Sequence, residues 1–234
     1  MEHILDNPVY HGLQTGDAAL SLGRGEVKFF NEEVSPFAGF REGYVRGFDD
    51  LYDQLPAGRK ILYATPKLIR APVGWKLAAE LKGIQFVFDT TPVIAEPAIK
   101  LILLGKPNVD EMMELAALTK PGPFGRRTIE FGHYYGIFEN GKLVAMAGQR
   151  LHPADFSEIS AVCTHPDHLG KGFAALLLQH QLQLIFSQGG VAFLHVREDN
   201  HRAIALYKRL GFKIRGPMNF YFLERGDQID GSAN

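Results

Sequence analysis

The most constraining feature of this 234-residue chain is the segment EISAVCTHPDHLGKGFAALLLQHQL at 158–182. Its start, 158–164, is typical of a strand, and 172–186 carries apolar stripes on one face of a helix. Between them stands Gly170-Lys171-Gly172. Glycines let a backbone turn and approach a ligand without a Cβ in the way, and the N–H groups of a helix's first turn attract anions. The segment therefore predicts an anion-binding turn, to which Lys171 could add a cation.

Two well-known phosphate loops do not fit this turn. The Gly-x-x-x-x-Gly-Lys-Ser/Thr pattern of a P-loop is missing, and no third glycine follows at the spacing of a Rossmann fingerprint. On local features alone, a plain strand-to-helix turn explains the two glycines about as well as a binding site does. Other parts of the chain must decide between these interpretations.

From about residue 95 onward, strands and helices alternate in a regular way. Asn140-Gly141 joins two strand-like runs and indicates a type I′ hairpin. Asn108, with Glu111 three residues later, indicates a capping box at a helix start, and Asn200 indicates another helix cap. We expect strands at 98–104, 133–138, 142–150, 158–164, 191–196, 213–214 and 219–223, and helices at 109–120, 172–186 and 200–211. This is an α/β (α+β) pattern, a mixed sheet with helices on its faces.

The first part of the chain has weaker patterns. Residues 27–30 and 60–64 indicate short strands, and 75–82 indicates a short helix, with Pro and Gly scattered between them. We expect two domains, a small N-terminal α/β segment over 1–92 and a larger domain over 93–234.

Composition excludes several classes of partner. The net charge is -1 with no long run of one sign, which argues against nucleic-acid and anionic-membrane partners. No apolar run reaches a membrane span, and the N-terminus lacks the pattern of a secretory signal. The single cysteine, Cys163, cannot form an intramolecular disulfide, so we expect a cytoplasmic protein. The histidines show no metal-ligand spacing, and we assign no metal.

Two further motifs resolve the ambiguity of the glycine turn. Thr164-x-Pro166 precedes the turn, and Leu-Tyr-Lys-x-Leu-Gly-Phe follows at 206–212, with Asn200 seven residues before Tyr207. Together they resemble the coenzyme A-binding core of GNAT acyltransferases, almost continuously from Glu158 to Phe212 and more faintly back to residue 95. The resemblance implies a mixed, mostly antiparallel central sheet flanked by helices, with acetyl-CoA as cofactor.

The resemblance also implies how the cofactor is held. The strand before the turn would splay from its neighbour, and the free backbone of Val162 and Thr164 would bind the pantetheine arm, which Asn200 would also touch. Asp167 stands where the family usually has Arg or Gln, so the resemblance does not carry over that side-chain contact to the diphosphate region. The full set of implied cofactor contacts is Val162, Cys163, Thr164, Leu169, Gly170, Lys171, Gly172, Phe173, Ala174, Asn200 and Tyr207.

Catalysis in such a site needs an acid and a base. The resemblance implies that Tyr207 protonates the departing thiolate; a phenol, with an ordinary pKa near ~10, is protonated at neutral pH. Glu158 is the candidate base for the amine, although a solvated strand-edge carboxylate is an equally good interpretation. Strand alternation predicts that Glu158 shares a face with Ser160 and Val162, and that Cys163 points the other way as a buried small apolar residue.

The expected function is transfer of an acetyl group from acetyl-CoA to a primary amine of a small molecule or peptide, directly in a ternary complex. The alternative is a non-catalytic acyl-CoA-binding sensor or interaction module on the same fold. An enzyme of nucleotide phosphates is a weaker third hypothesis, because it leaves the 206–212 motif unexplained. Proteins of this superfamily often pair, so a homodimer is among the expected states.

Overall fold

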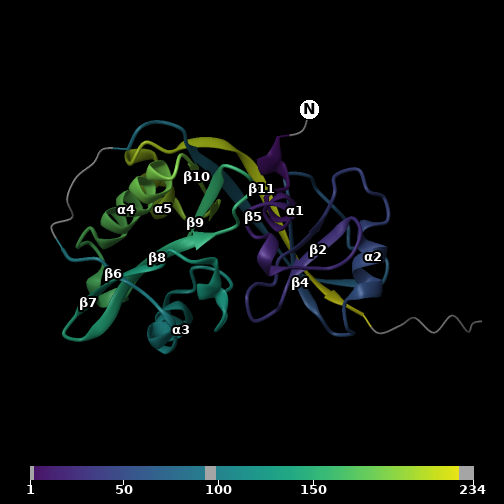
Figure 1. Cartoon of the computed structure of the whole chain (residues 1–234), viewed down its shortest axis with the longest axis horizontal. Coiled ribbons are helices and arrows are strands. Elements are labelled where there is room, and N and C mark those ends of the chain that lie inside the picture. The colour runs from purple at the N-terminus through teal and green to yellow at the C-terminus, as the bar shows by residue number, and fades with distance from the viewer. Residues whose placement is uncertain (1–2, 93–98, 227–234) are drawn as a thin grey trace, which may run out of the picture.

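The computed structural model describes residues 3–92 and 99–226. An eight-stranded sheet runs along the molecule in the order β4-β11-β5-β10-β9-β8-β7-β6 (Figure 1). Only β9 and β10 pair in parallel; the other neighbours are antiparallel. Its strands are β4 (Lys60–Thr65), β5 (Trp75–Phe88), β6 (Ile102–Leu103), β7 (Tyr135–Glu139), β8 (Lys142–Arg150), β9 (Phe156–Thr164), β10 (Val191–Arg197) and β11 (Lys213–Arg225). The expected mixed, mostly antiparallel sheet is confirmed.

Helices cover both faces of this sheet. On one side, which we call the α4 face, α4 (Phe173–Ser187) and α5 (His201–Arg209) pack against the central strands. On the other, the α3 face, α3 (Val109–Thr119) packs against β8 and β9. No helix among the described residues is long and apolar enough to cross a membrane.

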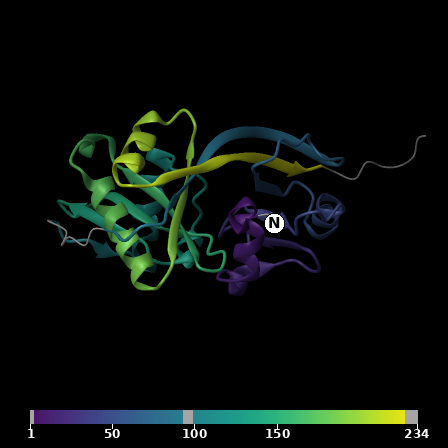
Figure 2. The ribbon, with the colours of Figure 1, turned by 90° about the horizontal axis from the view of Figure 1, so that it is seen from above.

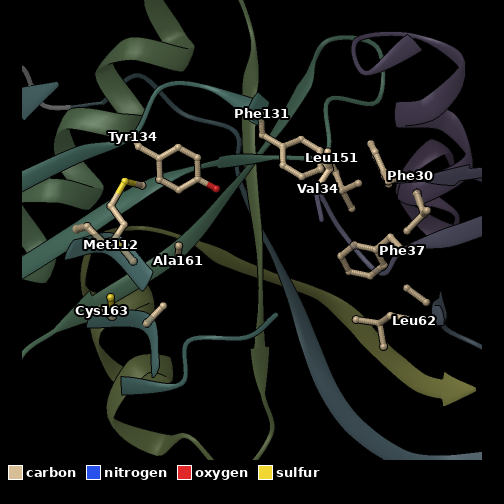
Figure 3. Packing of buried hydrophobic residues seen from close by; sticks show 14 of the residues in the cluster. Phe30, Val34, Phe37, Leu62, Met112, Phe131, Tyr134, Leu151, Ala161 and Cys163 are labelled. Carbon is tan, nitrogen blue, oxygen red and sulfur yellow. The ribbon is translucent and has the colours of Figure 1, made fainter. Parts of the chain in front are cut away.

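The N-terminal residues add a second, smaller lobe. It contains a three-stranded sheet of β1 (Ser21–Leu22), β2 (Val27–Phe30) and β3 (Ala38–Phe40), with α1 (Pro8–Gln14) and α2 (Gly47–Gln54). Its buried side chains join those of α3, β8 and β9 in one apolar cluster on the α3 face (Figure 3). This lobe therefore closes part of the α3 face of the main sheet.

A long ribbon of β5 and β11 connects the two lobes (Figure 2). Here the expectation of a helix at 75–82 is wrong, because these residues form the first half of β5. The segment WKLAAELK is rich in helix-forming residues, but its backbone pairs with β11 along the whole strand. A partner more than 130 residues away thus overrides local preference.

Other sequence predictions hold with adjusted limits. The strands at 27–30 and 60–64, the hairpin, and the helices at 172–186 and 200–211 are confirmed. Asn140 and Gly141 both have positive φ, as a type I′ turn requires. The two strands expected at 213–214 and 219–223 are one strand, β11, which absorbs the intervening residues through a bulge after Ile214.

Two details near α3 differ from the prediction. Asn108 stands at the helix start, but its side chain accepts a hydrogen bond from the N–H of Gly105 (3.0 Å), so the expected capping box is not formed. The strand expected at 98–104 is shorter: Ala98 lies outside the described residues, and only Ile102–Leu103 pair with β7.

Candidate active site

The site begins where β9 and β10 separate. Their parallel pairing is confined to 156–158 against 191–193. Beyond this point no strand in the described part of the chain pairs with the edge of β9 at 159–164 on that side, so its backbone groups there are available to a ligand. The splay that the sequence resemblance implied is present.

The glycine turn lies at the end of this open edge. Gly170 and Gly172 have φ of +85° and +80°, a conformation that favours glycine. No side chain caps α4, and its first intrahelical bond runs from the N–H of Leu176 to the carbonyl of Gly172. The preceding amides of the first turn therefore lack intrahelical partners, and a Cβ built on either glycine meets nothing within 4 Å. The turn offers donors facing open space.

A groove of about 560 Å³ on the α4 side joins the open edge of β9, the turn and α5. Every predicted cofactor residue except Lys171 lines it. The ammonium of Lys171 instead contacts the carboxylate of Glu139 (2.8 Å) and Nδ1 of His168 (3.1 Å). In this arrangement Lys171 is held beside the groove by Glu139.

The groove also contains cations that the sequence analysis missed. Arg202 and Arg209, both on α5, are among its lining residues. Their spacing of seven places them on one side of the helix, two turns apart, which is the signal that could have identified them. They supply positive charge to the groove, which Asp167 does not line.

The remaining two predicted contacts come from the start and the end of α5. Asn200 caps the helix, since its Oδ1 accepts from the N–H of Ala203 (3.1 Å). Tyr207 packs edge-on against the rings of Phe86 and Phe212, with ring centroids 5.9 Å away in each case. Burial raises the pKa of Tyr207 to about 12, so its hydroxyl is a proton donor throughout the neutral range.

A bulge in β9 changes which side chains share a face. Ser160 lies opposite Gly148 and Cys163 opposite Met146, so the alternation of β8 places Ser160 and Cys163 on the same face. The extra residue lies at Ala161, whose φ is +53°. The prediction that Cys163 points away from Glu158 and Ser160 is therefore wrong: all three lie on the α3 face, while Val162 turns to the α4 face.

Glu158 is buried, which excludes the solvated-edge interpretation. Its side chain is 1% exposed and is bound by Nε and Nη2 of Arg150, at 3.0 and 2.6 Å. Nδ1 of His195 lies 2.8 Å from the same carboxylate. Burial alone would raise the pKa of Glu158, but Arg150 and His195 hold it at about 2. The guanidinium of Arg150 also lies 4.7 Å from the ring centroid of Phe37, in the N-terminal lobe.

His195, which the sequence analysis did not single out, is the second member of this network. The side-chain amide of Gln85 is oriented by Arg215, which donates a hydrogen bond to its Oε1 (2.8 Å). The Nε2 of Gln85 therefore donates to the carbonyl oxygen of Leu5. The same Nε2 lies 2.9 Å from Nε2 of His195. The ring of His195 then accepts at Nε2 and donates from Nδ1 to Glu158. The only sequence signal was a histidine inside the otherwise apolar run of 191–196.

The two sides of the splay therefore differ in chemistry. The α4 side offers backbone donors, arginines and a phenol, which suits an anionic cofactor with a reactive end near Tyr207. The α3 side offers a carboxylate–imidazole pair, which can position or accept a proton. No cluster of possible metal ligands was found among the described residues.

Comparison with known proteins gives consistent results. A family model described as FR47-like protein matches residues 134–222. N-alpha-acetyltransferase RimI of Mycobacterium tuberculosis is 34% identical over 111 residues, which is 45% of this chain and 68% of that protein.

Two solved structures show the extent of the likeness. A putative acetyltransferase from the GNAT family of Novosphingobium aromaticivorans has a TM-score of 0.89 and 31% identity, covering 97% of this chain and all of that one. A GCN5-related N-acetyltransferase from Kribbella flavida has a TM-score of 0.62 at 15% identity, over 95% of this chain and 97% of that one. The likeness to the Novosphingobium protein includes the N-terminal lobe, and the likeness to the Kribbella protein shows a common fold.

Proposed function

Because the chain belongs to the GNAT superfamily of acetyltransferases, we propose that it moves the acetyl group of acetyl-CoA to a primary amine in a ternary complex. The observation that carries this proposal is the groove formed by the open edge of β9, the 170–172 turn and α5. Its backbone donors and cations suit the diphosphate of an acyl-CoA, and Tyr207 is among its lining residues.

In this proposal the cofactor diphosphate lies at the start of α4. The turn of Gly170 and Gly172 and the free first-turn amides donate to it, and the helix dipole favours its charge. Arg202 and Arg209 add cations from α5. The pantetheine arm takes the place of a strand partner along Val162 and Thr164, so the thioester reaches the gap between β9 and β10.

Tyr207 acts on the leaving sulfur. Its raised pKa keeps the proton on the phenol until negative charge develops on the thiolate, which the hydroxyl then stabilises and protonates. Acetyl transfer itself breaks the C–S bond of the thioester and forms an amide C–N bond. The amine must lose one proton in the process.

We assign proton acceptance to Glu158 and His195 acting together. A carboxylate with a pKa of about 2 is a weak base alone, because general bases work best near the operating pH. An imidazole oriented by a carboxylate is better matched to neutral pH. In this assignment Glu158 holds the ring of His195 in place through Nδ1. The amine, or a water, passes its proton to Nε2 of His195 after the amide of Gln85 has moved away from that nitrogen.

The acceptor class we propose is a free α-amino group. The support is the likeness to an N-alpha-acetyltransferase. The test is an acetyl-CoA turnover screen with thiol release and mass detection, over short peptides with free N-termini and over small alkyl and aryl amines. Transfer to the peptide α-amine is the expected result. Transfer only to side-chain or small amines would contradict the acceptor class.

The same screen addresses the non-catalytic alternative. One observation favours that alternative: Glu158 and His195 have side chains only 1% and 5% exposed, beneath the N-terminal lobe. Calorimetry that finds acetyl-CoA binding, together with no thiol release for any amine, would favour a sensor over an enzyme.

A further inference from the structure

Tyr134 has a buried hydroxyl that its fold does not explain. The residue directly precedes β7 and is 1% exposed. Among the described residues, none makes a hydrogen bond to this hydroxyl. Leaving a buried hydroxyl unpaired costs stability, and a phenylalanine would fill the same space without that cost. The hydroxyl therefore needs a hydrogen-bond partner other than the described residues.

The ring is placed beside the bulge of β9. It lies against Gly148, where an added Cβ would be 2.2 Å from the ring's Cδ1, so only glycine leaves room for the ring. Gly148 pairs with Ser160, the residue just before the bulge at Ala161. Figure 3 shows the Tyr134 hydroxyl pointing away from Met112 and toward the middle of the sheet. This is the α3 side of the splay, opposite the cofactor groove.

The buried ionisable groups on this side have polar partners of their own. Glu158 is bound by Arg150 and His195, and His195 also faces Gln85. Both Arg150 and Glu158 act electrostatically on Tyr134, but neither makes a hydrogen bond to it. Burial raises the pKa of Tyr134, so the phenol stays neutral next to this ion pair.

We propose that the Tyr134 hydroxyl binds the acceptor amine, accepting one N–H so that the nitrogen lone pair faces the thioester through the gap between β9 and β10. The inference rests on the proposed function. A phenol oxygen can accept this hydrogen bond without adding a second anion beside Glu158. The thioester comes from the α4 side and the amine from the α3 side, so the bulge separates the two binding sites.

Tyr134→Phe tests this proposal, with the peptide of highest turnover in the wild-type screen as acceptor. We expect the KM for that peptide to rise at least about tenfold, the effect of losing one good hydrogen bond. The KM for acetyl-CoA should stay within about twofold, and Tm should be equal or higher, because an unpaired hydroxyl has been removed.

Tyr221→Phe is the matched control. Tyr221 is as buried as Tyr134, but its hydroxyl is 3.1 Å from Ile69 N, which donates to it, and 3.3 Å from Lys67 O. This variant should lower Tm and leave the peptide KM unchanged.

Three results would overturn the proposal. An unchanged peptide KM in an otherwise active Tyr134→Phe enzyme refutes the role of Tyr134 alone. A fall in Tm as large as that of Tyr221→Phe means that the hydroxyl already has a structural partner. A wild-type protein that transfers acetyl to no amine refutes both this inference and the proposed function.

Discussion

The two sides of β9 are built in different ways. On the α4 side, the proposed cofactor groove is open and consists mainly of backbone donors at 170–174 and of side chains from α5. On the α3 side, Glu158 and His195 are buried. Arg150 of β8 binds Glu158, and Gln85 of β5 contacts His195. Arg150 in turn lies over Phe37 of the N-terminal lobe. The first side comes from two stretches of sequence, and the second from at least four.

This difference indicates how each side responds to substitution. A site made of backbone donors depends on the conformation of a few glycines and tolerates many changes of side chain. A buried charge network depends on every member, because removing one leaves another charge unpaired. We expect changes on the α4 side to alter cofactor binding with little loss of stability, and changes on the α3 side to do the reverse.

The largest effect should come from Gly172→Val. A β-branched residue cannot hold φ of +80° without strain, and its side chain would enter the space above the turn. We expect the Kd for acetyl-CoA in calorimetry to rise more than about 100-fold. Gly189→Val is the matched control, since Gly189 has φ of +78°, equally open surroundings and no place in the groove. Equal loss of binding in both variants would contradict the assignment of the turn.

Glu158→Gln should have the next largest effect, on stability. It leaves the buried Arg150 without its counter-charge, at a cost of about 3 kcal/mol in the free energy of unfolding at pH 7. Because the pKa of Glu158 is lowered in the folded protein, its contribution is present above about pH 4.5 and is lost as the pH falls toward 2. The free energy of unfolding of the wild type should fall between pH 4.5 and about pH 2. In Glu158→Gln this part of the pH dependence should be absent.

Urea unfolding at several pH values measures this effect. The control is Glu130→Gln, which removes an exposed ion pair with Arg127 and should cost less than about 1 kcal/mol. Similar losses for the two variants would mean that Glu158 does not stabilise the buried Arg150 as described.

Tyr207→Phe should slow turnover by about 100-fold, the usual contribution of a positioned general acid. The Kd for acetyl-CoA should be unchanged, because the ring still packs against Phe86 and Phe212. Stopped-flow measurement of thiol release checks this prediction. A variant as fast as the wild type would remove Tyr207 from the reaction.

Arg209→Ala should give the smallest effect, a rise of about fivefold in the Kd for acetyl-CoA, typical of an exposed charge contact. The effect should shrink at high salt because exposed charges are screened. Lys208→Ala is the control, since Lys208 is adjacent to Arg209 on the same helix but does not line the groove. An equal, salt-sensitive rise in the Kd for acetyl-CoA in both variants would mean that α5 attracts the cofactor only through its overall positive charge.

The elements that form the proposed cofactor groove were largely predictable because they are set by neighbouring residues. A strand, a glycine turn and a helix are consecutive in the chain, and Asn200 and Tyr207 are separated by one helix of fixed geometry. The ion pair of Lys171 was not predictable, because its partner Glu139 lies in a hairpin 32 residues earlier in the chain. Arg202 and Arg209 could have been found from their helical spacing.

The arrangement on the α3 side, the proposed acceptor side, was not predictable from the pattern of residues. Alternation alone put Cys163 opposite Glu158, and the bulge at Ala161 reversed that relation. Nothing near Tyr134 in the sequence shows that its ring would lie against Gly148. Likewise, the helix-like WKLAAELK became a strand only because β11 pairs with it.

The sequence by itself determined the order of the central strands and helices in the chain, the conformation of the glycine turn and the cap of α5, since each depends on neighbouring residues. Tertiary structure alone decided the strand at 75–88, the faces of β9 after the bulge, and the buried set of Arg150, Glu158 and His195. Those features depend on hydrogen bonds and charges between distant segments, whose free energy exceeds local preference only once the chain has folded.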